Sequence, residues 1–107
     1  MLEAGQIGKF NRIVLKTGYT DLRCGIPTLT EILTNFYGVD FRDEGVLYLF
    51  CGTKCNKIKG LIREREGFML LSIQLFTDRV RWIRKDDGLK EISQEQFDLI
   101  KRGKRIE

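Results

Sequence analysis

The sequence predicts an α+β fold in a single domain, with an antiparallel sheet of about four to five strands, one main helix after the first strand and a short C-terminal helix. Three observations lead to this prediction. The 107 residues suffice for one hydrophobic core. Short apolar runs with strand periodicity fill the second half, and hairpin-length turns, which join antiparallel strands, separate them. Only two segments have the apolar spacing of an amphipathic helix.

The first half of the chain predicts one strand and the main helix. Residues 13–15 form a β-branched and apolar run, and a short turn is expected at 21–24. The helix is expected over 27–37, because Pro27 suits a first helical turn and Gly38 suits the position after a helix. Its predicted apolar face consists of Ile26, Leu29, Ile32, Leu33 and Phe36.

The second half predicts a meander of strands. Residues 46–50 are apolar at every position, as in a strand covered on both faces. Residues 57–63 alternate between an apolar face and a mostly basic face, and 68–75 carry apolar residues on one side. Residues 79–83 alternate arginines with apolar residues, which predicts one more strand.

The chain ends in a short extended piece at 89–92 and a helix. Ser93 followed by Gln96 is typical of a capping box. We expect residues 1–107 to form one domain, with a loose N-terminal lead-in at 1–11 and a basic tail at 101–107.

Composition restricts the chemistry. The chain has no histidine, which excludes imidazole bases, histidine metal ligands and nucleophiles paired with histidine. The net charge is +4, and it is unevenly distributed: residues 1–50 carry five basic and six acidic side chains, whereas residues 51–107 carry fourteen and nine. This asymmetry indicates an acidic partner or a solvated basic surface.

The cysteines and the N-terminal residues predict a cytoplasmic protein with free thiols. Cys24, Cys51 and Cys55 lack the partners of a zinc site, so we expect no metal and no cofactor. The first residues do not resemble a signal peptide, and the apolar runs are too short to span a membrane.

The carboxylates do not predict an enzyme. They lie mostly in predicted turns, where acidic side chains usually cap or solvate. No phosphate-binding glycine loop, nucleophile elbow or dinucleotide motif occurs. The carboxylates in question are Asp21, Asp40, Asp43, Glu44, Asp78, Asp86 and Asp87.

Basic side chains give better support for DNA binding. Lys57, Lys59 and Arg63 share one strand face, and Arg79 and Arg81 share another, so aligned faces would form a basic surface for phosphates. A turn residue and the tail could extend this surface; these are Lys54, Lys101, Arg102, Lys104 and Arg105. The alternative is that these cations protect a sheet face and edge from aggregation.

The aromatic residues add little to this choice. Five of them lie on apolar faces or in buried runs and are expected in the core rather than in base stacking; these are Phe36, Phe50, Phe68, Trp82 and Phe97. Tyr19 and Tyr37 lie beside turns and stay open as stacking residues.

The order of these motifs resembles one family. Residues 20–25 resemble a T-D-M-R-K-G opening before a helix. After it come the strand to Phe50, the Ile58-Lys59 pair, the run 79–82 and the final helix. Over residues 12–103 this order is similar to that of the TnpB accessory proteins of bacterial insertion sequences of family sixty-six, which are unrelated to the RNA-guided nuclease of the same name.

The resemblance implies a non-catalytic protein that assists transposition beside a separate transposase. It adds Arg23 to the candidate DNA-binding residues, and it matches Lys59, Arg79 and Trp82, of which we interpret Trp82 as structural. The chain departs from the family at Cys24, where lysine is usual, and in the turn after Phe50, which carries fewer cations.

Three hypotheses follow. The first is DNA binding, at the ends of the element, through a basic sheet face and tail. The second is a protein-interaction module that docks on the transposase without touching DNA. The third is a relic domain, which the loss of basic residues in the turn would allow.

Overall fold

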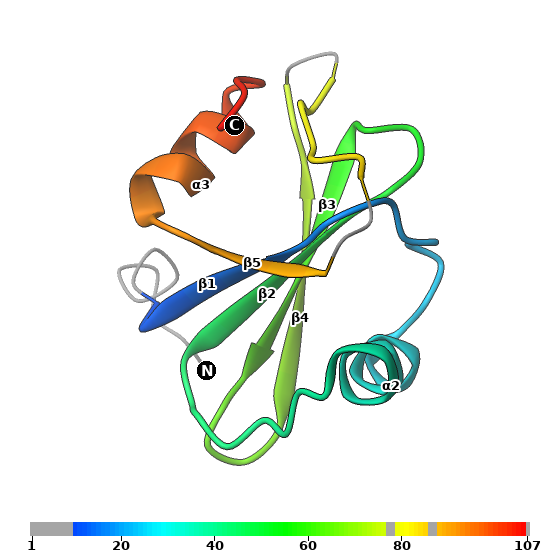
Figure 1. The fold of residues 1–107 in the computed structure, drawn as a ribbon, viewed down its shortest axis with the longest axis vertical. Coiled ribbons are helices and arrows are strands. Elements are labelled where there is room, and N and C mark those ends of the chain that lie inside the picture. The colour runs from blue at the N-terminus through cyan, green and yellow to red at the C-terminus, as the bar shows by residue number, and fades with distance from the viewer. Residues whose placement is uncertain (1–9, 77–78, 86–87, 107) are drawn as a thin grey trace.

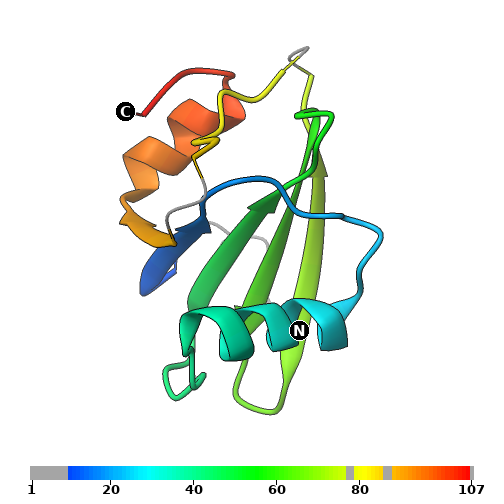
Figure 2. The same cartoon turned by 45° about the vertical axis from the view of Figure 1, so that its right-hand side comes forward.

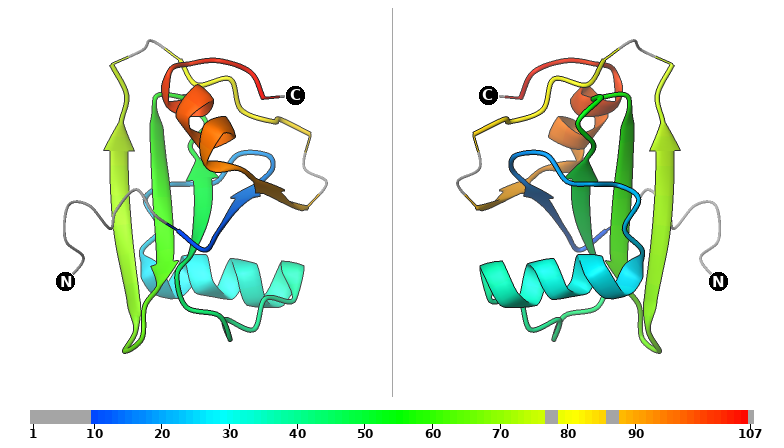
Figure 3. Two further views of the ribbon diagram at one scale, coloured as in Figure 1. Left: turned by 90° about the vertical axis from the view of Figure 1, so that its left-hand side faces the viewer. Right: turned by 90° about the vertical axis from the view of Figure 1, so that its right-hand side faces the viewer.

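The computed structural model describes residues 10–76, 79–85 and 88–106. Residues 1–9 of the expected lead-in at 1–11, and the acidic residues Asp78, Asp86 and Asp87, therefore lie outside the described residues. A five-stranded sheet in the order β4-β3-β2-β1-β5 separates two helices, so the molecule has three layers (Figures 1 and 3). The elements are β1 (Arg12–Lys16), α2 (Ile26–Tyr37), β2 (Val46–Cys51), β3 (Lys57–Arg63), β4 (Phe68–Gln74), β5 (Leu89–Ile92) and α3 (Gln94–Lys101).

The predicted α+β class is confirmed, but the sheet is mixed rather than antiparallel. β1 and β2 run parallel, with Ile13 opposite Leu47. The prediction of an antiparallel sheet rested on the short turns of the second half. The connection from β1 to β2 instead contains α2, and a crossover helix is what parallel neighbours require. The other three pairings, β1 with β5, β2 with β3 and β3 with β4, are antiparallel.

The two faces of the sheet bury two separate cores. On β2, Leu47 and Leu49 face the core beneath α3, whereas Tyr48 and Phe50 face the core beneath α2. All six residues of β2 are buried, as its uninterrupted apolar run predicts. The expected division of β3 is also present, because Ile58 and Ile62 join the α3 side and Leu61 joins the α2 side.

Helix α2 crosses one face of the sheet (Figure 2). Gly25 is its N-cap, Pro27 lies in its first turn, and Gly38 ends it with a left-handed φ of +67°. Leu29 and Leu33 are completely buried against the sheet.

The prediction that Phe36 belongs to the core is wrong, because this side chain is 78% exposed. It has the helical spacing of the buried face, but it faces a hollow that Lys16 also lines instead of an apolar part of the sheet. Helical spacing identifies the face of a helix, but it does not show how far the sheet beneath it extends.

The predicted capping box starts α3. The Ser93 hydroxyl accepts a hydrogen bond from Gln96 N at 3.1 Å, and the Gln96 side chain accepts one from Ser93 N at 2.8 Å. Phe97 and Ile100 then reach the core. After the helix the chain folds back, because Lys104 N donates to Leu99 O at 2.9 Å.

Replacing Ser93 with alanine is expected to lower the free energy of unfolding by about 1 kcal/mol, because the amide of Gln96 loses its acceptor. Urea unfolding followed by circular dichroism measures this change. Gln94→Ala, at an exposed position of the same turn, is the control and should stay within about 0.5 kcal/mol. Equal effects of the two variants would contradict a role for the cap.

Among the helices of the described ranges, none combines the length and apolarity needed to cross a membrane.

Candidate nucleic-acid interface

Three segments distant in the sequence meet at one end of the sheet. They are the loop from β1 to α2, the turn from β2 to β3 and the segment 79–85 (Figure 1). Backbone hydrogen bonds join them: Thr20 N donates to Cys51 O at 2.8 Å, Gly18 N to Ile83 O at 2.8 Å, and Val80 N to Cys55 O at 2.6 Å. The backbones of these segments are therefore held in fixed relative positions.

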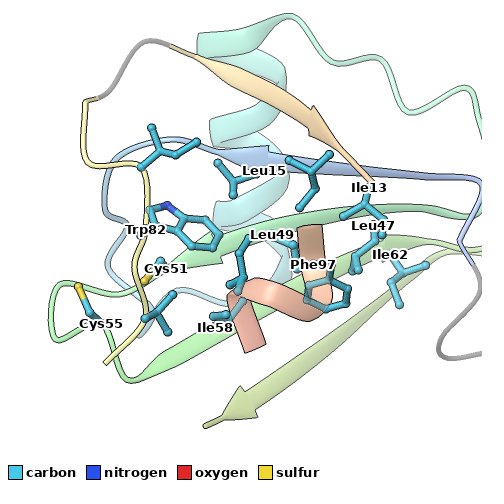
Figure 4. Close-up of a cluster of buried hydrophobic side chains, with 14 residues drawn as sticks. Ile13, Leu15, Leu47, Leu49, Cys51, Cys55, Ile58, Ile62, Trp82 and Phe97 are labelled. Atoms are coloured by element: carbon cyan, nitrogen blue, oxygen red, sulfur yellow. The ribbon is translucent and has the colours of Figure 1, made fainter. Parts of the chain in front are cut away.

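The segment 79–83 is extended, but it is not a strand of the sheet, so the strand predicted there is wrong. Its alternation has another cause. Val80 and Trp82 point into the core below α3, and the Trp82 indole Nε1 donates to Lys16 O at 3.0 Å (Figure 4). The residues between them, Arg79 and Arg81, are exposed. Alternate burial against side chains produces the same sequence pattern as pairing in a sheet.

A polar hollow of about 350 Å³, which we call the basic pocket, lies at this junction. Five cationic side chains from two segments line it, and no carboxylate does so among the described residues. It is lined by Tyr19, Cys55, Arg79, Val80, Arg81, Trp82, Arg84, Lys85 and Arg105. Such a concentration of one charge creates a positive potential that attracts polyanions.

The basic pocket gathers three of the predicted cations and two that the sequence analysis missed. Arg79, Arg81 and Arg105 were predicted, whereas Arg84 and Lys85 were not. These two directly follow the Trp82-Ile83 pair and continue the basic run, and this continuation was the signal that could have identified them. The approach of Arg105 from beyond α3 is a tertiary contact with no signal in the local sequence.

A second group of predicted cations lines a groove, the Arg23 groove, that shares Tyr19 with the basic pocket. This groove has a volume of about 560 Å³ and contains Arg23, Lys54 and Lys57. Arg23 forms a close ion pair with Asp21, with Nη2 and Oδ2 2.7 Å apart. Hydrogen bonds from Arg23 lower the pKa of Asp21 to about 2, so this carboxylate is ionised and neutralised by its neighbour.

Lys59 and Arg63, the other two predicted cations of β3, do not form a basic sheet face, so this prediction is wrong. Their side of β3 is the side that α2 covers, where Leu61 is buried. The Lys59 ammonium donates to Cys24 O at 3.1 Å, and Arg63 lies 3.5 Å from the Glu44 carboxylate and donates to Glu64 O. Arg79 and Arg81 flank residues that pack into the opposite core.

The end of the chain contributes only Arg105 to the basic pocket. Lys101 pairs with Asp98 at 3.2 Å, and its ammonium lies 4.4 Å from the centre of the Phe97 ring. Arg102 and Lys104 are exposed and do not line this pocket.

The cysteines are free thiols. Cys51 is fully buried, and desolvation raises its pKa to about 12, so it is protonated at neutral pH. A hydrogen bond with Cys55 raises the pKa of the Tyr19 phenol. Across the part of the chain that the structure describes, no group of three or more cysteine and acidic side chains could hold a metal ion.

Comparison with known proteins identifies the family. The family model described as "IS66 Orf2 like protein" matches residues 11–107. A relative from Sinorhizobium fredii, named uncharacterized protein y4hO, is 28% identical over 96 residues, which are 90% of this chain and 83% of the relative. No solved structure matches. Since the family model covers nearly the whole chain, this protein belongs to the IS66 Orf2-like proteins, the TnpB-like accessory proteins of insertion sequences.

Proposed function

We propose that this protein assists transposition, without catalytic chemistry of its own, by binding the DNA of the element ends at the basic pocket while a separate transposase performs the reaction. The main support is the convergence of five cationic side chains on one hollow. Phosphate contacts of this kind provide affinity that does not depend on sequence.

The Arg23 groove extends this surface. It shares Tyr19 with the basic pocket, so a DNA backbone that crosses this junction can contact the cations of both hollows. Because Asp21 is paired with Arg23, its charge opposes a polyanion less than a free carboxylate would. The DNA path is therefore proposed along the junction of three segments and not across the face of the sheet.

A salt titration tests the proposal. Fluorescence anisotropy of labelled element-end DNA should show binding at low salt, with log affinity falling linearly as log salt rises. The triple variant Arg79→Ala, Arg81→Ala, Arg84→Ala should bind more weakly. Its slope of log affinity against log salt should be smaller in magnitude by about three, close to one for each phosphate contact removed.

The control removes the same charge elsewhere on the surface. Arg42, Arg65 and Lys90 are exposed and line neither the basic pocket nor the Arg23 groove, so their triple alanine variant should largely retain the wild-type slope. Absence of binding at low salt, or equal slopes for the two triple variants, would rule out the basic pocket as the DNA site.

Docking on the transposase is the second candidate function. It is favoured by Phe76, a fully exposed aromatic residue just after β4, and by the position of β4 at the edge of the sheet. Co-purification with the transposase that Phe76→Ala abolishes, together with no DNA binding, would favour this candidate.

A further inference from the structure

Another hollow, which we call the Lys16 pocket, shares Tyr19 with the basic pocket and Tyr19, Thr20 and Asp21 with the Arg23 groove. Its volume is about 640 Å³, within the range of sites that hold small organic groups. Three aromatic residues and one isoleucine line it together with polar groups. The lining residues are Lys16, Tyr19, Thr20, Asp21, Ile32, Phe36, Tyr37 and Gly88.

Lys16 gives this pocket a buried positive charge. The side chain is only 6% exposed, and its ammonium donates to Thr17 O at 3.1 Å and lies 5.9 Å from the centre of the Tyr37 ring. In the ranges that the structure covers, no carboxylate pairs with it. Buried charges are normally paired, so this ammonium can accept an anionic or strongly polar ligand without first breaking an ion pair.

Thr20 adds an unused hydrogen-bonding group. This residue is 7% exposed, and its hydroxyl has no hydrogen-bond partner in the described chain. Buried hydroxyls are nearly always paired. Thr20 lines both the Lys16 pocket and the Arg23 groove, so a small movement of its side chain would let the hydroxyl bond a ligand in the Lys16 pocket.

Phe36 supplies an aromatic surface with no partner in the core. It is 78% exposed on the last turn of α2 and lines the same pocket as Tyr37. A flat aromatic surface beside a cation is typical of sites that bind unpaired nucleotides, because the base stacks on the ring while its phosphate contacts the cation.

From this geometry, and on the basis of the proposed function, we infer that the Lys16 pocket takes an unpaired nucleotide of the bound DNA. Tyr19 lines both this pocket and the basic pocket, so a strand whose phosphates contact the arginines can pass an adjacent base into the Lys16 pocket. A base within a duplex is stacked and paired and cannot enter such a pocket without leaving the helix. The preferred ligand is then single-stranded DNA or a duplex with an unpaired nucleotide.

Three labelled DNAs of matched sequence test this inference by fluorescence anisotropy: a single strand, its blunt duplex, and the duplex with one unpaired nucleotide. The wild-type protein should bind the first and third more tightly than the second. Phe36→Ala should weaken binding of those two by about 5- to 100-fold, since one stacked base is lost, and should leave the duplex unchanged.

Phe76→Ala is the matched control, because Phe76 is the other large exposed aromatic among the described residues and does not line the Lys16 pocket. It should retain the preference for unpaired DNA. Lys16→Met keeps a long apolar stem but removes the ammonium, and it should weaken the same two DNAs as Phe36→Ala does.

Different experimental outcomes would overturn this inference and the proposed function. Equal binding of all three DNAs, or a Phe36→Ala protein with its full preference for unpaired DNA, would overturn the inference, although the effect of the arginine variants could persist. Absence of binding to every DNA would overturn both.

Discussion

Replacing Trp82 with alanine is expected to lower the free energy of unfolding by about 3–5 kcal/mol. The indole is 5% exposed and packs with Leu49 and Val80 in the core beneath α3. It also donates a hydrogen bond to Lys16 O, so its removal leaves both a cavity and an unpaired carbonyl.

Urea unfolding followed by circular dichroism measures this loss, since the variant has no tryptophan left for fluorescence. Trp82→Phe keeps most of the ring but not the N–H, and it should lose less stability than Trp82→Ala does. If Trp82→Ala were as stable as the wild type, the segment 79–85 could not be anchored as described. Where the alanine variant remains folded, its DNA affinity should also fall, because Arg79 and Arg81 flank the anchor.

Replacing Leu33 with alanine is expected to lower the free energy of unfolding by about 2–5 kcal/mol. Leu33 is completely buried where α2 packs on the sheet, so the shortened side chain leaves a cavity between two layers. Thermal or urea unfolding by circular dichroism measures the change.

Phe36→Ala is the control on the same helix. Its ring is largely exposed, so the free energy of unfolding should change by about 0.5 kcal/mol or less. A large loss at Phe36 would mean that the ring packs on the protein, and the variant could then no longer serve as a test of base stacking.

Local patterns were sufficient to predict most of the fold. The Ser93 and Gln96 pair predicts the start of α3, and the period of β3 predicts which of its residues reach each core. These features depend on residues a few positions apart. The parallel pairing of β1 with β2 could not be predicted in this way, because it depends on which strand lies next to another after the α2 crossover.

The candidate site was predicted less well than the fold. Alternating cations are visible in the sequence of both β3 and 79–83. Only the structure shows that Lys59 and Arg63 contact other groups of the protein and that the arginines of 79–83 line a pocket. Arg84 and Lys85 were missed because the alternating pattern ends before them. The roles of Lys16 and Phe36 depend on the size of the hollow between them, which no sequence period describes.

The position of β1 in the sheet also has a consequence for how the chain is made. This strand is synthesised before both of its neighbours in the sheet, since Ile13 pairs with Leu47 on one side and with Ile92 on the other. Its second edge stays unpaired until β5 has been synthesised, and contacts so distant in sequence form slowly. Because Arg105 follows α3 in the chain, a nascent chain that ends before α3 would hold only part of the basic pocket. The basic pocket would therefore be complete only after the residues that follow α3 have been synthesised.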